Sequence, residues 1–249
     1  MVLYEYPFHE GIRTMLRLEH LFRRLELLAG RDDPIDHHFA LATMFEIMDV
    51  ASRADLKSDL LKELERHRAQ LQSYRGHPGL DEAALDAVVA RIDEAFATLN
   101  QMPGKAGQAL SGNEWLMSIR SRISIPGGTC EFDLPGYYAW QQHAPERRRE
   151  DLAGWRATLA PLAEALQVLL GLLRDSGQAQ RVLAPGGNFQ QSLPAGKTYQ
   201  LLRVRVDDGL VPEITGHRLL VSVRFMRPDS EGRLRPAAAD TSFDLTLCA

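Results

Sequence analysis

Two hydrophobic periodicities divide this chain of 249 residues. From His9 to about Arg122, apolar residues recur at three- and four-residue spacing, the pattern of amphipathic helices. From Lys197 to Leu247, apolar and polar residues alternate, the pattern of half-buried strands. Helical and strand patterns are thus segregated along the chain instead of alternating regularly. This order favours an α+β fold over a doubly wound α/β fold.

Local signals place individual helices in the first part. Asp33 and Pro34 are typical of a helix cap and first position, whereas Gly30, Gly76 and Pro103 are typical of helix ends. Helices are predicted over residues 10–30, 32–51, 58–76, 80–101 and 113–122. A longer helix is predicted from about Pro145 to Asp175, with a kink or break at Pro161.

The stretch "SIRSRISIPGGTCEFDLPGYYAW", residues 118–140, interrupts the helical pattern. It alternates and contains Pro126-Gly127-Gly128, which predicts two short strands joined by a turn. Residues 184–196 are predicted as a loop, and the strands over 197–208, 217–228 and 241–249. The predicted fold is a helical domain (9–117 plus 145–178) packed with a discontinuous antiparallel β-sheet or barrel-like domain (1–8, 118–144 and 179–249).

Composition excludes several classes of protein. The chain is 45% hydrophobic and 25% charged, which is typical of a globular protein. No run approaches the roughly 18 apolar residues of a membrane span, and the first residues lack the pattern of a secretory signal. Cys130 and Cys248 form neither a disulfide framework nor a metal-type spacing. We therefore expect a cytoplasmic protein without membrane insertion.

Arginine dominates the basic residues, which include only four lysines among 29. A GC-rich genome explains such a bias, and recognition of carboxylates by arginine forks is the alternative. One basic stripe, at spacings of four, three and four, is predicted on the first helix: Arg13, Arg17, His20 and Arg24. Arg120 and Arg122 end a helix, and Arg203, Arg205 and Arg224 point outward from strands. Each set is either a solvated face or part of a binding surface.

Most catalytic interpretations are weak. Gly196-Lys197-Thr198 lacks the earlier glycine and the following helix of a phosphate-binding loop. The adjacent His37 and His38 diverge on a helix, so with Asp36 and Glu46 they favour a helix start over a metal site. Cys130 has no base implied nearby, and His217 is most simply a turn residue, with a general base or binding contact as alternatives. No cofactor is predicted.

Four segments carry a family resemblance: "VLYEYPFHEGIRTMLRLEHL", "LLKELERHRAQLQSYRGHPGLD", "RSRISIPGGTCEFDLPGYYAW" and "ITGHRLLVSVRFMRPDSE". Together they resemble the ZapD family, the FtsZ-interacting cell division proteins of proteobacteria. The likeness runs nearly end to end, and "RISIPGG-x-C-x-FDLP" and "GH…RFM" are its most specific parts.

The resemblance implies a non-enzymatic homodimer that binds the C-terminal tail of FtsZ, bundles its filaments and supports Z-ring assembly at mid-cell. The family's basic surface would correspond here to Arg17, Arg120, Arg122, His217 and Arg224, and we add Arg13 from the same stripe. Glu114 and Tyr138 depart from the family pattern, where a basic residue and a histidine are expected, so the pocket is expected to be redistributed.

Two other classes of function remain as alternatives. The first is a small-molecule-binding protein or enzyme that uses the β domain as its pocket. The second is a nucleic-acid-binding module using the same arginines. The net charge of −4 and the lack of aromatic residues among the basic ones count against the second.

Overall fold

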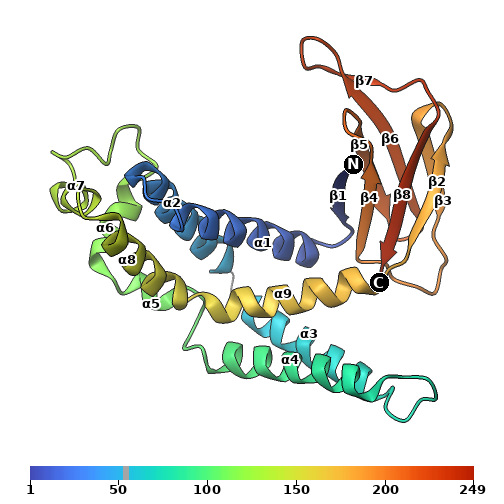
Figure 1. Ribbon diagram of the computed structural model, residues 1–249, viewed down its shortest axis with the longest axis horizontal. Coiled ribbons are helices and arrows are strands. Elements are labelled where there is room, and N and C mark those ends of the chain that lie inside the picture. The colour runs from blue at the N-terminus through green and yellow to red at the C-terminus, as the bar shows by residue number, and fades with distance from the viewer. Residues whose placement is uncertain (53–55) are drawn as a thin grey trace. The chain divides into compact units, whose positions relative to one another are not determined.

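The computed structural model describes residues 1–52 and 56–249, which divide into two compact units (Figure 1). The sheet unit comprises Met1–Met15 and Leu170–Ala249, and the helical unit comprises Leu16–Leu169. Helices α1 (Glu10–Ala29) and α9 (Ala160–Asp175) each contribute residues to both units. The fold is α+β, which confirms the predicted class.

The helices predicted in the first part of the chain are present. Those wholly within the helical unit are α2 (Pro34–Ala51), α3 (Leu56–Gln72), α4 (Glu82–Gln101), α5 (Gln108–Ser111), α6 (Glu114–Arg122), α7 (Pro135–Gln141) and α8 (Pro145–Ala157). Side-chain caps explain several starts: Asp33 accepts from the Ile35 amide at 2.7 Å, and Asn113 accepts from the Leu116 amide at 3.0 Å.

The predicted break near Pro161 is confirmed. Helices α8 and α9 meet at an angle of 65°, and Pro161 is the second residue of α9. Because proline has no amide hydrogen and crowds the preceding turn, a continuous helix through Leu159 is disfavoured. No single helix among the described residues is long and apolar enough to cross a membrane; α8 and α9 meet those limits only when taken together.

The sheet unit holds two open antiparallel sheets, not a closed barrel. One has the order β1-β4-β8-β2, and in the other β6 lies between β3 and β5 and also pairs with β7. The strands are β1 (Val2–Pro7), β2 (Ala179–Ala184), β3 (Asn188–Ser192), β4 (Leu201–Val206), β5 (Val211–His217), β6 (Leu220–Pro228), β7 (Leu234–Pro236) and β8 (Thr241–Cys248).

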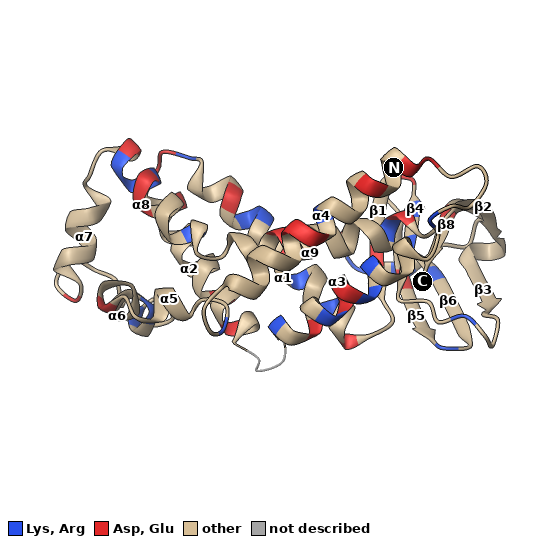
Figure 2. Ribbon diagram, turned by 90° about the horizontal axis from the view of Figure 1, so that it is seen from below, with Lys and Arg blue, Asp and Glu red and all other residues tan. Residues whose placement is uncertain are grey.

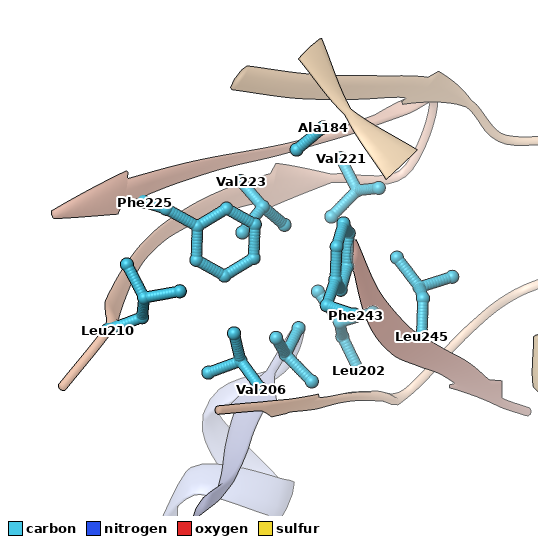
Figure 3. Packing of buried hydrophobic residues seen from close by; sticks show 10 residues of the cluster. Ala184, Leu202, Val206, Leu210, Val221, Val223, Phe225, Phe243 and Leu245 are labelled. Atoms are coloured by element: carbon cyan, nitrogen blue, oxygen red, sulfur yellow. The ribbon is translucent and has the colours of Figure 1, made fainter. Parts of the chain in front are cut away.

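Side chains from both sheets form one apolar core (Figure 3). Phe243 of β8 lies at its centre, with ring centroids 4.9 Å from Phe225 and 5.3 Å from Phe189. Strand β4 contributes Leu202, Val204 and Val206, as its alternation predicts.

Two local predictions are wrong. Residues 123–134 form no strands; they form successive tight turns, and α7 follows. The amides of Ile125 and Gly128 donate to carbonyls three residues earlier, each at 2.9 Å. Gly127 has a φ of 69°. The alternating isoleucines therefore accompany turns, and residues 118–144 lie in the helical unit and not with the sheets.

The second error is the loop predicted over residues 184–196. Most of this segment belongs to two strands and the turn between them. Strand β2 ends at Ala184, a short 3-10 turn spans Pro185–Gly187, and β3 begins at Asn188. Each strand pairs with a different sheet, β2 with β8 and β3 with β6. Gly187 lets this turn lie close to the segment between β7 and β8, because a Cβ there would meet the Ala237 carbonyl oxygen at 2.2 Å.

A buried arginine fixes the region around α7. Arg148 of α8 donates from Nη1 to the carbonyls of Gln141 and His143, each at 2.7 Å, and from Nη2 to the Asp32 carbonyl. Its Nε donates to His37 Nδ1 at 3.0 Å. The guanidinium therefore joins the start of α2 to the end of α7.

Replacing Phe243 with alanine should reduce the free energy of unfolding of the sheet unit by about 3–5 kcal/mol, because the substitution leaves a cavity between the sheets. Phe132→Ala is the matched control: this side chain is 79% exposed, so its loss should change stability by less than about 0.5 kcal/mol. Urea unfolding measures both. Equal effects of the two substitutions would contradict the assigned core.

Candidate partner-binding surface

The six predicted site residues are divided between the two units. Arg17, Arg120 and Arg122 belong to the helical unit, whereas Arg13, His217 and Arg224 belong to the sheet unit. Each group therefore has to be judged within its own unit.

Arg120 and Arg122 occupy the last turn of α6, where basic side chains interact favourably with the helix dipole. Arg120 Nη2 donates to Asp49 of α2, and Arg122 Nη1 donates to Asp133 at 3.2 Å. Arg122 is exposed, and Arg120 is about a third exposed. Both guanidinium groups are held in position by one carboxylate each while keeping other N–H donors. This is the best-organised pair among the predicted residues.

The basic stripe on α1 is only partly a surface feature. Arg24 donates to Thr43 at 2.9 Å and also contacts Glu46, so it links α1 to α2. Arg13 pairs with Glu10 of the same helix at 3.3 Å. Arg17 is exposed. The stripe therefore divides into a structural end at Arg24 and a more accessible end at Arg13 and Arg17.

His217 and Arg224 share one exposed face of the second sheet. His217 ends β5 opposite Leu220, and Arg224 lies on β6 opposite Glu213 of β5. The two pairs are four positions apart along β6, a distance of roughly 13 Å along an extended strand. His217 Nδ1 accepts from the Leu219 amide at 3.3 Å, as expected of a turn residue. The two side chains lie on one surface but do not form one compact site.

Arg203, predicted to point freely outward, is instead part of an ion-pair cluster. Its Nε lies 3.1 Å from Glu5 Oε1, and Arg174 of α9 donates to both oxygens of Glu5 at 2.9 and 2.7 Å. All three side chains are less than a quarter exposed. The alternation correctly predicts the face of Arg203 but gives no sign of Glu5, which comes from the other end of the chain. Arg205 is exposed.

Sequence reasoning also missed an exposed apolar surface on the helical unit. Leu27 of α1 is 59% exposed, and Ile35 and Phe39 of α2 are 65% and 53% exposed. The two α2 residues are four positions apart and so share one face of that helix. The same region holds two ion pairs: Arg24 of α1 pairs with Glu46 of α2, and Arg31, just after α1, pairs with Asp36 of α2. We call Leu27, Ile35 and Phe39 the α1–α2 apolar patch.

A groove between α1 and α8–α9 has a volume of about 620 Å³. Phe22, Leu166 and several alanines give it an apolar lining, and Glu19, Glu26, Glu164, Arg23 and Arg156 supply charges of both signs. Figure 2 likewise shows basic and acidic positions interspersed along the helices. The groove is therefore not a uniformly basic channel.

The residues considered for other chemistry have structural partners. His37 and His38 bond respectively to the Arg31 carbonyl at 2.6 Å and to the Tyr137 hydroxyl at 2.9 Å. Lys197 lies over the ring of Tyr199 at 5.2 Å, in a segment without a following helix. Across residues 1–52 and 56–249, no three His, Cys, Asp or Glu side chains are grouped so that they would hold a metal ion.

Comparison with known proteins gives a consistent result. A family model for ZapD, described as a cell division protein, matches residues 16–224. The curated cell division protein ZapD of Ralstonia nicotianae is 53% identical over 251 aligned positions, which cover 100% of this chain and 99% of the relative. The ZapD proteins of Ralstonia pickettii and Cupriavidus pinatubonensis are 52% and 53% identical with the same coverage.

These full-length matches place the α+β chain among the cell division proteins. The chain belongs to the ZapD family. Family membership therefore assigns it a role in cell division, as the resemblance of its sequence segments predicted.

Removing the negative charge of Glu5 should destabilise the sheet unit, because Arg174 and Arg203 would lose their shared carboxylate in a largely buried position. We expect Glu5→Gln to lower the free energy of unfolding by about 1–3 kcal/mol. Glu231→Gln is the control: Glu231 and its partner Arg233 are 65% and 70% exposed, so the loss should be below about 0.5 kcal/mol. Chemical denaturation of both variants tests the difference, and an unaffected Glu5→Gln protein would contradict a structural role for the cluster.

Proposed function

We propose that this protein is a non-enzymatic division factor that binds the C-terminal tail of FtsZ and crosslinks FtsZ filaments as a homodimer. It acts in the cytoplasm, is recruited to the Z-ring at mid-cell and promotes septum formation. The observation that carries the proposal is the match to ZapD proteins over the entire chain. The exposed, positioned arginines of α6 support it.

Tail binding is assigned first to Arg120 and Arg122. A guanidinium group presents five donors in a rigid fork that matches a carboxylate. Asp49 and Asp133 hold the two side chains near the end of α6 without burying them. Arg17 is proposed as a further contact on the helical unit, and Arg13, His217 and Arg224 are proposed as separate contacts on the sheet unit. An acidic, partly apolar peptide suits such a surface better than a nucleic acid, since the chain has a net charge of −4.

Self-association is assigned to the helical unit. The α1–α2 apolar patch exposes three large side chains to solvent, and ion pairs lie beside it. A two-fold symmetric contact requires a surface that complements itself, and apolar residues among charges of both signs meet that requirement. A dimer presents two tail-binding surfaces, the minimum needed to bridge two filaments.

The alternative of an enzyme or ligand-binding protein has less support. The larger described cavity of the sheet unit, of about 390 Å³, is lined by Asp207, Asp208, Asp240 and Arg227 beside small residues. Among the described residues, its lining includes Ser242 but no histidine that would serve as its base. We therefore do not assign it a second function.

Reversing both charges at the end of α6 should weaken tail binding. We expect Arg120→Glu with Arg122→Glu to lower the affinity for an FtsZ tail peptide by at least about tenfold, because attraction becomes repulsion. The milder pair Arg120→Gln with Arg122→Gln should have a smaller effect in the same direction. Fluorescence anisotropy measures the affinity, and circular dichroism checks the fold.

A matched control for the charge reversal is Arg66→Glu with Arg91→Glu on α3 and α4. It changes the net charge equally at two exposed positions. If the α6 variant stays folded and binds the peptide as tightly as the control does, the tail-binding site lies elsewhere.

Disrupting the α1–α2 apolar patch should produce a folded monomer. Leu27→Glu with Phe39→Glu places charges at positions already exposed in the single chain, so folding should survive while association is lost. Light scattering should give twice the 27.9 kDa chain mass for the wild type and a single chain mass for the variant. Leu234→Glu, at an exposed position of β7, is the control and should remain dimeric. A monomeric wild type at micromolar concentration would rule out bivalent crosslinking.

Salt should separate tail binding from dimerisation. The Debye length falls from about 10 Å at 0.1 M to about 3 Å at 1 M, so exposed arginine–carboxylate contacts weaken while apolar contacts persist. Bundling of FtsZ filaments should therefore fail at moderate salt, well before the dimer dissociates. The monomeric variant should bind the peptide at low salt without bundling filaments. Sedimentation of FtsZ polymers measures bundling; bundles that persist in 1 M salt, or with the verified monomer, would contradict the mechanism.

A further inference from the structure

His37 is held in one protonation state by its two partners. The imidazole is fully buried near the start of α2. Its Nε2 lies 2.6 Å from the Arg31 carbonyl, which accepts only, so Nε2 carries a proton and donates. Its Nδ1 lies 3.0 Å from Nε of Arg148, which donates only, so Nδ1 has to be an acceptor. The structure therefore assigns His37 as the neutral Nε2–H tautomer.

The same arginine connects this histidine to α7. The carbonyls of Gln141, the last residue of α7, and of His143, in the turn before α8, each accept from Arg148 Nη1. In the part of the chain that the structure describes, the acceptors of Arg148 are three backbone carbonyls and the His37 imidazole, with no carboxylate among them. Its orientation consequently depends on these carbonyls together with an uncharged acceptor at His37 Nδ1.

The carboxylates near His37 act in the opposite direction to Arg148, and each has a partner of its own. Asp33 and Asp36 lie on its own side, at the start of α2, and favour protonation, but Asp33 caps the helix and Asp36 pairs with Arg31 at 3.2 Å. From the α7–α8 side come Arg148 itself and the uncharged ring of Trp140, whose centroid is 6.3 Å away. Asp151 accepts from Trp140, and Asp32 pairs with Arg149. Burial, together with Arg148, lowers the pKa of His37 below its ordinary value.

We propose that His37 and Arg148 form an acid-sensitive latch that holds α7 against α2 and α8. A proton added at Nδ1 removes the acceptor of Arg148 Nε and places two cations in contact. Arg148 then withdraws, the carbonyls of Gln141 and His143 lose their donor, and α7 is released. The inference rests on the geometry of the helical unit and is independent of the proposed function.

The direction of the pH dependence follows from linkage. A histidine whose pKa is lowered by folding is protonated first in the open state. The latch is thus fully effective above a pH of about 6.5, the ordinary pKa of histidine, and weakens as the pH falls below that value. The open state gains about tenfold in population between pH 7.5 and 5.5, provided that His37 stays neutral in the closed state.

Release of α7 would also disturb its aromatic neighbours. Tyr137 and Trp140 of α7 contact Trp115 of α6, with ring centroids 6.2 and 5.6 Å apart. Trp115 in turn stacks on Trp155 of α8 at 5.4 Å. Tryptophan emission therefore reports on the latch. Helix α6, which carries Arg120 and Arg122, contacts α7 directly through Trp115.

Hydrogen exchange of the full chain at pH 7.5 and 5.5, corrected for the intrinsic rate, tests the proposal. Protection of amides in residues 135–143 should fall about tenfold in the wild type at the lower pH, with a change in tryptophan emission. In His37→Gln the amide oxygen accepts from Arg148 and the amide nitrogen donates to Arg31, without titrating, so the loss should disappear. His77→Gln, at an exposed position, should behave as the wild type does.

A second variant identifies the titrating group. His38 bonds to the Tyr137 hydroxyl and is a further histidine in contact with α7, as is His143, whose amide donates to the Trp140 carbonyl. If His38→Gln abolishes the pH effect and His37→Gln does not, the latch is not at His37 and the proposal is wrong. Protection in the wild type that is equal at both pH values would also overturn it. If His37→Gln does not fold, nitrogen NMR of the wild type decides. An unprotonated His37 Nδ1 at pH 7.5, with protection of the α7 amides falling as Nδ1 is protonated, supports the latch. Protonation of His37 without any change in the protection of α7 refutes it.

Discussion

The buried guanidinium of Arg148 ties together three separate stretches of the helical unit. A planar fork with fixed donor directions is stable in an apolar interior only when acceptors lie in its plane. Here the acceptors come from the segment before α2, from the end of α7 and from the following turn. Three stretches of chain must therefore converge on one side chain. The cluster of three tryptophans and Tyr137 packs beside this convergence and adds apolar contact to it.

The sheet unit depends on a different long-range constraint. Strand β1 comes from the start of the chain and pairs antiparallel with β4, which lies almost two hundred residues later. Glu5 on β1 then joins Arg203 on β4 to Arg174 on α9. These contacts explain why the unit combines the first residues with Leu170–Ala249. They also explain why an outward arginine on a regular strand is not automatically available to a partner.

Long periodic segments were predictable because their signals are local. Residues within each element were enough to predict helices α1 to α4 and strands β4, β6 and β8. The same holds for the break between α8 and α9. The stretch 123–134 was misread because Ile123 and Ile125 alternate as they would in a strand, while the chain turns there every three residues. Strands β2 and β3 were missed because both are short and a Pro-Gly-Gly turn separates them, and because their partners β8 and β6 lie far along the chain.

The elements that carry the candidate residues were predictable, but the contacts of those residues were not. That Arg120 and Arg122 end a helix follows from the sequence, but Asp49 is 71 residues from Arg120 and no local pattern predicts it. Arg148 is a stronger case, since it is the middle one of three consecutive arginines. Arg147 is exposed, Arg149 pairs with Asp32 and Glu146, and only Arg148 is buried. Which arginine of such a run is buried depends on hydrogen-bond acceptors that come from distant parts of the chain.

The internal partners of Arg120 and Arg122 bear on how strongly a tail can bind. On the proposed function, an incoming carboxylate either uses the remaining N–H donors or displaces Asp49 and Asp133, so each contact is an exchange between similar ion pairs. Such an exchange at an exposed site contributes little net free energy, about 1 kcal/mol or less per pair. Single-site affinity would then be weak, and selectivity for filaments over free subunits would come from two linked sites on one dimer. Weak exposed contacts combined with a mainly apolar dimer interface would allow crosslinks to form and dissociate while the crosslinker itself stays intact.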